Sequence, residues 1–157
     1  MTNGWNVNQP IVSEDPRQVF AKVPFMQALG VQRDFSEGGK ARLSLDPKPE
    51  HGNVIGAVHG GIVVTLLDVA MASAAVSAVD FLKTVVTLNL DTCFVEPGRG
   101  HLVADGEVVR SDDTVVWCRA RITDADGRLV AKAQGSFRYL PRPHALPASV
   151  ADAGSPR

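Results

Sequence analysis

The longest apolar stretch of the chain covers residues 60–79 and contains a single charged residue, Asp68. Nearly all of the remaining positions hold apolar or small side chains, so a helix built from this stretch would have no polar face. Such a helix belongs inside a core rather than on a surface. The pattern therefore predicts one long, buried helix over 60–79.

Alternation of polar and apolar residues predicts strands both before and after this helix in the sequence. In residues 40–46, for example, Ala41, Leu43 and Leu45 would share one face. The predicted strands are 31–36, 40–46, 84–95, 101–110, 114–123 and 129–139. A short amphipathic helix over 16–29, interrupted by Pro24 and stopped by Gly30, precedes them.

The strand at 84–95 is the first element after the long helix. Simple alternation places Val86, Leu88 and Leu90 on one of its faces and Thr87 with Asn89 on the other. The two faces would therefore differ clearly in polarity.

The order of elements is short helix, two strands, long helix and four strands. A meander of about six antiparallel strands curled around one central helix would bury that helix, which is the outline of the α+β hotdog fold. We expect an N-terminal extension over 1–15 and this domain over 16–140. Residues 141–157 are rich in Pro and Ala, and we expect this tail to be disordered.

Composition limits the classes of function. The 157 residues suffice for one domain, and 16 basic against 17 acidic side chains give a net charge of −1. No basic excess favours binding to nucleic acid or to an anionic membrane. Asp68 would lie in the middle of any membrane span over 60–79, where a carboxylate is costly, so a core helix fits better.

Compartment and metal chemistry are judged from the termini and from the Cys and His residues. The first ten residues lack a basic and an apolar region, so we expect a cytoplasmic protein. Cys93 and Cys118 cannot form a disulfide framework, and both are expected to be buried thiols in strands. The four His residues have no metal-ligand spacing, so no metal is expected.

The segment from Asn53 to Asp68 carries the candidate chemistry. An unpaired carboxylate buried on an otherwise apolar helix costs several kcal/mol, which favours a functional reason for its presence. Asp68 is therefore the leading candidate for a catalytic group. Gly60 and Gly61 begin the helix and expose backbone N–H groups that suit a carbonyl or oxyanion. His59 could act as a base, but a structural role in the loop is favoured.

The spacing of these groups has a consequence for assembly. Gly60 and Asp68 are eight residues apart, which is about 12 Å along one helix axis, too far to act on one carbonyl. Two antiparallel copies of the helix would place Gly60 of one chain opposite Asp68 of the other. We therefore expect a homodimer, or a homotetramer built from dimers, with composite sites at the interface.

The pattern Asn-x5-His-Gly-Gly-x6-Asp, read from Asn53 to Asp68, resembles hotdog acyl-CoA thioesterases. The resemblance extends from Pro24 to Tyr139 and is closest to the phenylacetate-degradation (PaaI-type) branch of the 4-hydroxybenzoyl-CoA thioesterase superfamily. It implies hydrolysis of an aromatic or short- to medium-chain acyl-CoA. Coenzyme A is then part of the substrate, and no cofactor is needed.

The same resemblance implies roles for individual residues. Asp68 matches the catalytic carboxylate, as general base or nucleophile, and Gly60 matches the donor to the thioester carbonyl. Asn53 matches the residue that orients the water or the thioester, and Thr87 the hydroxyl that contacts the water. Relatives often carry a basic residue in the hairpin that here contains Asp112 and Asp113, so the usual phosphate contact is in doubt. Lys83, Arg99 and Arg110 are possible substitutes.

Two other functions share this fold. A hotdog enoyl-CoA hydratase would carry an Asp–His or His–Glu pair, and neither pattern occurs here. A non-catalytic acyl-CoA-binding sensor would usually carry a DNA-binding segment, for which the residues before the first helix are too few. The chain also lacks Gly-x-Ser-x-Gly, which argues against a serine thioesterase.

Overall fold

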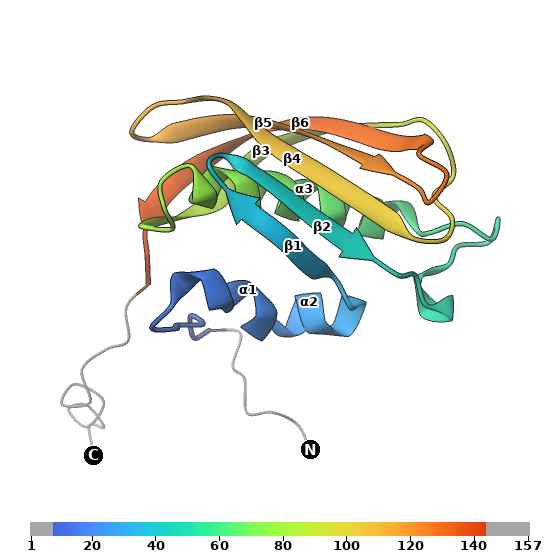
Figure 1. Cartoon of the computed structure of the whole chain (residues 1–157), viewed down its shortest axis with the longest axis horizontal. Helices are drawn as coiled ribbons and strands as arrows, with labels where there is room; N and C mark the ends of the chain where they lie inside the picture. The colour runs from blue at the N-terminus through green and yellow to red at the C-terminus, as the bar shows by residue number, and fades with distance from the viewer. Residues whose placement is uncertain (1–7, 144–157) are drawn as a thin grey trace, which may run out of the picture.

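A computed structural model describes residues 8–143 of the chain. One six-stranded antiparallel sheet curls over a single long helix, α3 (Gly60–Ser77). Figure 1 shows the sheet as the upper layer, α3 directly beneath it, and two short helices lower still. The predicted hotdog architecture is confirmed.

The strands match the predicted segments closely. They are β1 (Gln32–Glu37), β2 (Lys40–Leu45), β3 (Lys83–Phe94), β4 (Leu102–Ser111), β5 (Val115–Thr123) and β6 (Leu129–Pro141). The predicted N-terminal helix is divided at Pro24 into α1 (Val19–Lys22) and α2 (Pro24–Leu29), preceded by the 3₁₀ turn η1 (Pro16–Gln18). A second 3₁₀ turn, η2 (Pro49–His51), lies in the loop before α3.

The strand order differs from the predicted meander. It is β1-β2-β4-β5-β6-β3, so β4 pairs with β2 while β3 lies at the far edge beside β6. The chain leaves β2, passes beneath the sheet as α3, and returns at the opposite edge. Because β3 pairs only with β6 among the described strands, one long edge of β3 is open.

The core lies between the sheet and α3. Its largest fully buried side chains come from both layers: Phe137, Leu43, Leu45, Leu66, Leu67, Met71, Leu102 and Ile122. Gly106 on β4 allows the close approach, because a Cβ there would lie 2.4 Å from the carbonyl oxygen of Ala70 on α3. By length and composition α3 could span a membrane, but half of it is buried inside the domain, as in a core helix.

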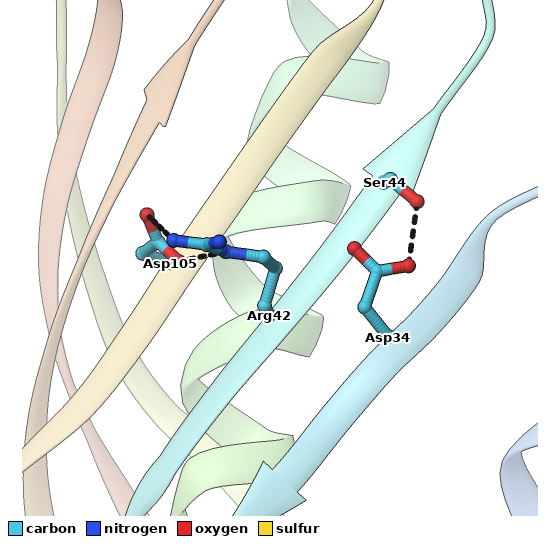
Figure 2. Close-up of polar contacts among 4 residues, drawn as sticks. All are labelled: Asp34, Arg42, Ser44 and Asp105. Carbon is cyan, nitrogen blue, oxygen red and sulfur yellow. Dashed lines mark hydrogen bonds and ion pairs between the residues drawn. The ribbon is translucent and has the colours of Figure 1, made fainter.

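The outer face of the sheet carries several polar contacts between neighbouring strands. Arg42 on β2 forms an ion pair with Asp105 on β4, 2.7 Å between Nε and Oδ1, and Ser44 donates to Asp34 on β1 at 2.8 Å (Figure 2). Arg119 and Glu107 pair across β5 and β4 in the same way. The functional residues predicted from the sequence lie on the opposite side of the sheet, on α3 and in the loop before α3.

The two ends of the domain are less regular. β6 continues to Pro141, one residue past the predicted domain end, and Arg142 donates to the carbonyl of Ser13 at 3.3 Å. The rest of the expected tail, from residue 144, and residues 1–7 lie outside the described residues.

Candidate active site

Asp68 lies on α3 and faces β3, the strand at the open edge of the sheet. It is half-buried, and its Oδ1 accepts a hydrogen bond of 2.8 Å from the hydroxyl of Thr87 on β3. Burial raises the pKa of this carboxyl above its ordinary value, while the Thr87 hydrogen bond acts in the opposite direction and lowers the pKa. The site thus contains a partly desolvated carboxylate with one defined partner.

Thr87 and Asn89 lie on opposite faces of β3 because the strand contains a bulge between them. The register with β6 pairs Thr87 with Phe137 but Asn89 with Ser136, so the alternation shifts between them. The predicted grouping of Thr87 with Asn89 on one face is therefore wrong. Thr87 faces α3 and the core side, whereas Asn89 lies on the outer face.

Gly60 is the first residue of α3, and its backbone N–H has no acceptor among the described residues. A Cβ on Gly60 would lie 3.4 Å from Cε1 of Phe94, so the ring of this exposed side chain packs against the glycine. A free N–H at the positive end of a helix dipole suits a developing oxyanion.

His59 is the N-cap of α3. Its Nδ1 accepts a hydrogen bond of 3.0 Å from the N–H of Gly61. One of the unpaired donors of the helix terminus is thereby satisfied by the imidazole. The contact gives His59 the structural role favoured above.

Asn53 holds the loop that leads into α3. Its Oδ1 accepts from the N–H groups of Ile55 at 3.1 Å and Ala57 at 3.0 Å, which is an Asx-type turn. Arg99 supports the same loop by donating to the carbonyls of Gly56 and Ile55. The amide NH₂ of Asn53 makes no hydrogen bond within residues 8–143, so it is available as a donor.

The predicted residues therefore form two groups. Asp68 and Thr87 are in contact, while Gly60, His59 and Asn53 lie together at the N-terminal end of α3. The eight residues between Gly60 and Asp68 amount to about 12 Å of helix. One chain alone does not bring the carboxylate and the N–H donor to the same carbonyl.

Two of the three basic residues considered for coenzyme A phosphates, Lys83 and Arg99, already have contacts. Arg99 supports the loop as described, and Lys83 donates to the carbonyl of Asp113 at 3.0 Å, with its ammonium over the Tyr139 ring. The acidic hairpin has a structural reason, since Asp112 accepts from two backbone N–H groups, which lower its pKa.

The two cysteines differ. Cys118 is buried, and desolvation raises the pKa of its thiol to about 12. Cys93 is exposed on the outer face of β3, so the expectation that both thiols are buried is wrong for this residue. Within residues 8–143, no three His, Cys, Asp or Glu side chains lie close enough to hold a metal ion.

Sequence reasoning missed Phe94 and Arg33. Phe94 lies near the end of the predicted strand 84–95, yet it packs on Gly60. Arg33 was part of an ordinary predicted strand, but its guanidinium is half-buried between aromatic rings. Both contacts join residues from separate segments of the chain, so no local sequence pattern predicts them.

Comparison with known proteins gives a family match. Residues 55–131 match the model of the thioesterase superfamily. A protein of Halobacterium salinarum named "Putative esterase" is 37% identical over 123 residues, which are 71% of this chain and 82% of the relative. A medium/long-chain acyl-CoA thioesterase of Salmonella typhimurium is 25% identical over 131 residues, covering 73% and 84% of the two chains.

Solved structures share the fold. A thioesterase family protein from Silicibacter pomeroyi superposes with a TM-score of 0.76 at 27% identity, covering 82% of this chain and 98% of that one. The PaaI protein of the Escherichia coli phenylacetic acid degradation operon gives a TM-score of 0.74 at 20% identity, covering 81% and 91%. At that identity the second likeness concerns the fold alone.

Proposed function

The chain belongs to the thioesterase superfamily, and we propose that it hydrolyses acyl-CoA thioesters with Asp68 as the catalytic carboxylate. The observation that carries the proposal is the contact between Asp68 and Thr87 beside the open edge of β3. A half-buried carboxylate with a raised pKa and a hydroxyl partner is suited to exchange protons with water or to attack a carbonyl.

Two routes fit this geometry. As a general base, Asp68 takes a proton from water while the water oxygen bonds to the thioester carbon. The resulting tetrahedral oxyanion then expels the thiolate of coenzyme A, which takes up the proton. As a nucleophile, Asp68 itself bonds to the carbon and expels the thiolate, and water then hydrolyses the mixed anhydride. In both routes Thr87 orients the carboxylate by its hydrogen bond.

The oxyanion needs donors, and we propose the Gly60 N–H of a second chain for this task. A donor of this kind must lie about 3 Å from the oxyanion, whereas Gly60 and Asp68 of one chain are separated by about 12 Å. A homodimer with antiparallel α3 helices would resolve this separation. Asn53 would add its free amide donor near the carbonyl or the attacking water.

The open edge of β3 supports association. β3 has 12 residues, and the apolar side chains Val86, Leu88 and Phe94 on it are 44%, 54% and 55% exposed. A long apolar edge strand is a template for pairing with another strand. A second copy could pair along this edge and set its own α3 opposite the first, and two such dimers could form a tetramer.

We further propose that the chain belongs to the PaaI-type branch and works in the cytoplasm. It would act there on a soluble acyl-CoA, without nucleic acid or membrane partners. Coenzyme A belongs to the substrate, and the chemistry assigned to Asp68 uses no cofactor.

The test is release of free thiol from a panel of acyl-CoA substrates by the wild-type protein and by Asp68→Asn. The panel contains phenylacetyl-CoA, straight saturated chains and an enoyl-CoA. Thioester hydrolysis that falls at least about a hundredfold in Asp68→Asn, with little change in KM, is expected for loss of the base or nucleophile. Hydration of the enoyl-CoA without thiol release would instead identify a hydratase.

A further inference from the structure

A pocket of about 290 Å³ lies between the N-terminal segment, α1, α3 and the start of β3. Asp68 and Thr87 do not line this pocket, but neighbours of both do. Val69 follows Asp68 on α3, and Val85 precedes Thr87 by two residues on the same face of β3. Ala72 and Val76 continue the wall along α3. The lining therefore extends from the neighbourhood of Asp68 along α3 and β3, and most of it is apolar.

Three cations line this apolar pocket, and no Asp or Glu does. They are Arg33, Lys83 and Arg142. Each donates to a backbone carbonyl, Arg33 to Arg17, Lys83 to Asp113 and Arg142 to Ser13. Within the described part of the chain, none of the three forms an ion pair with a carboxylate. Within residues 8–143, their positive charge therefore has no direct counter-ion.

Arg33 is held firmly in this lining. Its guanidinium carbon lies 5.0 Å from the ring centre of Phe20 and 5.5 Å from that of Phe81. Burial lowers the pKa of Arg33, which shows that the charge is partly desolvated. The carboxylate of Asp15 acts on Arg33 only through space, because its own oxygen accepts the N–H of Arg17 at 2.9 Å.

Phe81 is placed there by an unusual backbone. Asp80 and Phe81 have φ values of 50° and 60°, in the left-handed region that an aromatic residue rarely adopts. The Phe81 side chain is nevertheless buried, with 7% exposed, and its ring faces Arg33. Strained positions of this kind gather at functional sites, where the surroundings impose them.

We infer that this pocket takes the acyl chain and selects one that ends in a carboxylate, so that the preferred substrate is the coenzyme A monothioester of a medium-chain dicarboxylic acid. The inference rests on the proposed thioesterase function. Apolar walls would hold the methylene groups, and the terminal carboxylate would supply a counter-ion for Arg33, Lys83 and Arg142.

The dimensions agree with a medium chain. Lys83 precedes Thr87 by four residues, which is about 13 Å along a strand. An extended chain advances about 1.3 Å per C–C bond, so eight to ten carbons span about 9 to 11 Å, and the flexible lysine side chain would reach over the remainder. A short aromatic acyl group would leave the three cations without a partner.

The experiment compares non-hydrolysable analogues in which a methylene separates the sulfur of coenzyme A from the acyl carbonyl. Three eight-carbon chains ending in a methyl, a carboxamide and a carboxylate are titrated calorimetrically into the full-length protein. The variants Arg33→Met and Lys83→Met remove single cations, and Arg128→Met removes an exposed cation from the β5–β6 hairpin as a matched control. Hydrolysis of octanoyl-CoA is measured in parallel.

The carboxylate analogue is expected to bind the wild type at least about tenfold more tightly than the methyl analogue, as for a charge-assisted hydrogen bond. The advantage should shrink in Arg33→Met and Lys83→Met and persist in Arg128→Met. Equal affinity for the methyl and carboxylate ends would overturn the inference, even with octanoyl-CoA hydrolysed normally. Failure to hydrolyse any thioester would count against the proposed function alone, because analogue binding is read without turnover.

Discussion

The Thr87 hydroxyl and the Asp68 carboxylate are joined by a hydrogen bond of 2.8 Å between β3 and α3. This bond opposes the main electrostatic effect at Asp68, because burial raises the pKa of the carboxyl and the bond lowers it. In the proposed mechanism Thr87 would therefore have two separable functions, to orient the carboxylate and to keep it ionised. The first prediction separates them.

Thr87→Val removes the hydroxyl but keeps the shape of the side chain. Without the hydrogen bond the pKa of Asp68 rises further, so Asp68 becomes ionised only at higher pH. The acidic limb of the kcat/KM profile should move to higher pH, and turnover near neutrality should fall. Thr87→Ser keeps a hydroxyl and should retain the wild-type profile. An unshifted limb in Thr87→Val would mean that the bond does not influence the reacting group.

Asp68→Asn tests the cost of burying the carboxylate. Because its pKa is raised on folding, the native chain holds the Asp68 proton more tightly than the unfolded chain does. The resulting stabilisation is present below the unfolded pKa of about 3.9 and is lost as the pH rises through the folded value. Asp68→Asn should therefore match or exceed the wild-type free energy of unfolding at neutral pH and converge with it in acid.

Urea unfolding of both proteins at the two pH values measures this difference. A marked loss of stability in Asp68→Asn at neutral pH would identify Asp68 as a structural residue whose charge the fold needs.

The composite site is tested by mixing two inactive chains. Gly60→Pro deletes the N–H at the first helical position, where proline is tolerated, and His59 before it has ψ of 135°, which suits a residue preceding proline. A dimer of one Gly60→Pro chain and one Asp68→Asn chain would contain one intact site and one doubly damaged site. Random mixing should then restore about one quarter of wild-type activity.

Gly60→Ala is the matched control, because it adds a Cβ near Phe94 but keeps the N–H. It should retain much more activity than Gly60→Pro. No recovery in confirmed mixed dimers would mean that each site is built from a single chain.

The sequence predicted the positions of the helices and strands better than the order in which the strands pair. All six strands and α3 follow from local periodicity, because burial on one side of a sheet imposes alternation on each strand. The position of β3 beside β6 could not be read in this way, since pairing depends on contacts between distant segments. The face of β3 on which Thr87 lies was predicted wrongly for a related reason. A bulge at Leu88 shifts the alternation, and β6 lies so close there that a Cβ on Gly135 would be 2.8 Å from the carbonyl oxygen of Asn89.

The candidate site was partly predictable for the same reason. Asp68 and Gly60 stand out because each departs from its local pattern, a charge in an apolar helix and a glycine pair at a helix start. The half-buried Arg33 does not stand out, because its partners Phe20 and Phe81 come from separate segments. Exposure of Cys93 likewise follows from its place on the outer face of an edge strand rather than from its neighbours in sequence.

His59 should matter for the helix rather than for the chemistry. His59→Ala removes the acceptor for the Gly61 N–H and should lower the free energy of unfolding by about 1 kcal/mol, as for other lost N-caps. His59→Asn supplies a different cap and should recover most of this stability together with near wild-type turnover. Thermal unfolding and thiol release measure the two effects. A large loss of turnover in a stably folded His59→Asn would reinstate the imidazole as a base.

Asn53 combines a structural oxygen with a free amide, and Asn53→Asp separates them. The aspartate keeps an acceptor for the N–H groups of Ile55 and Ala57, so the loop before α3 should stay folded. It lacks the NH₂ group, and the loss of one substrate hydrogen bond should reduce kcat/KM by about tenfold. Asn53→Ala loses both functions and should be less stable as well as less active. Wild-type kcat/KM in Asn53→Asp, with a loss confined to Asn53→Ala, would restrict Asn53 to holding the loop, leaving the Gly60 N–H as the donor that the proposed mechanism assigns to the oxyanion.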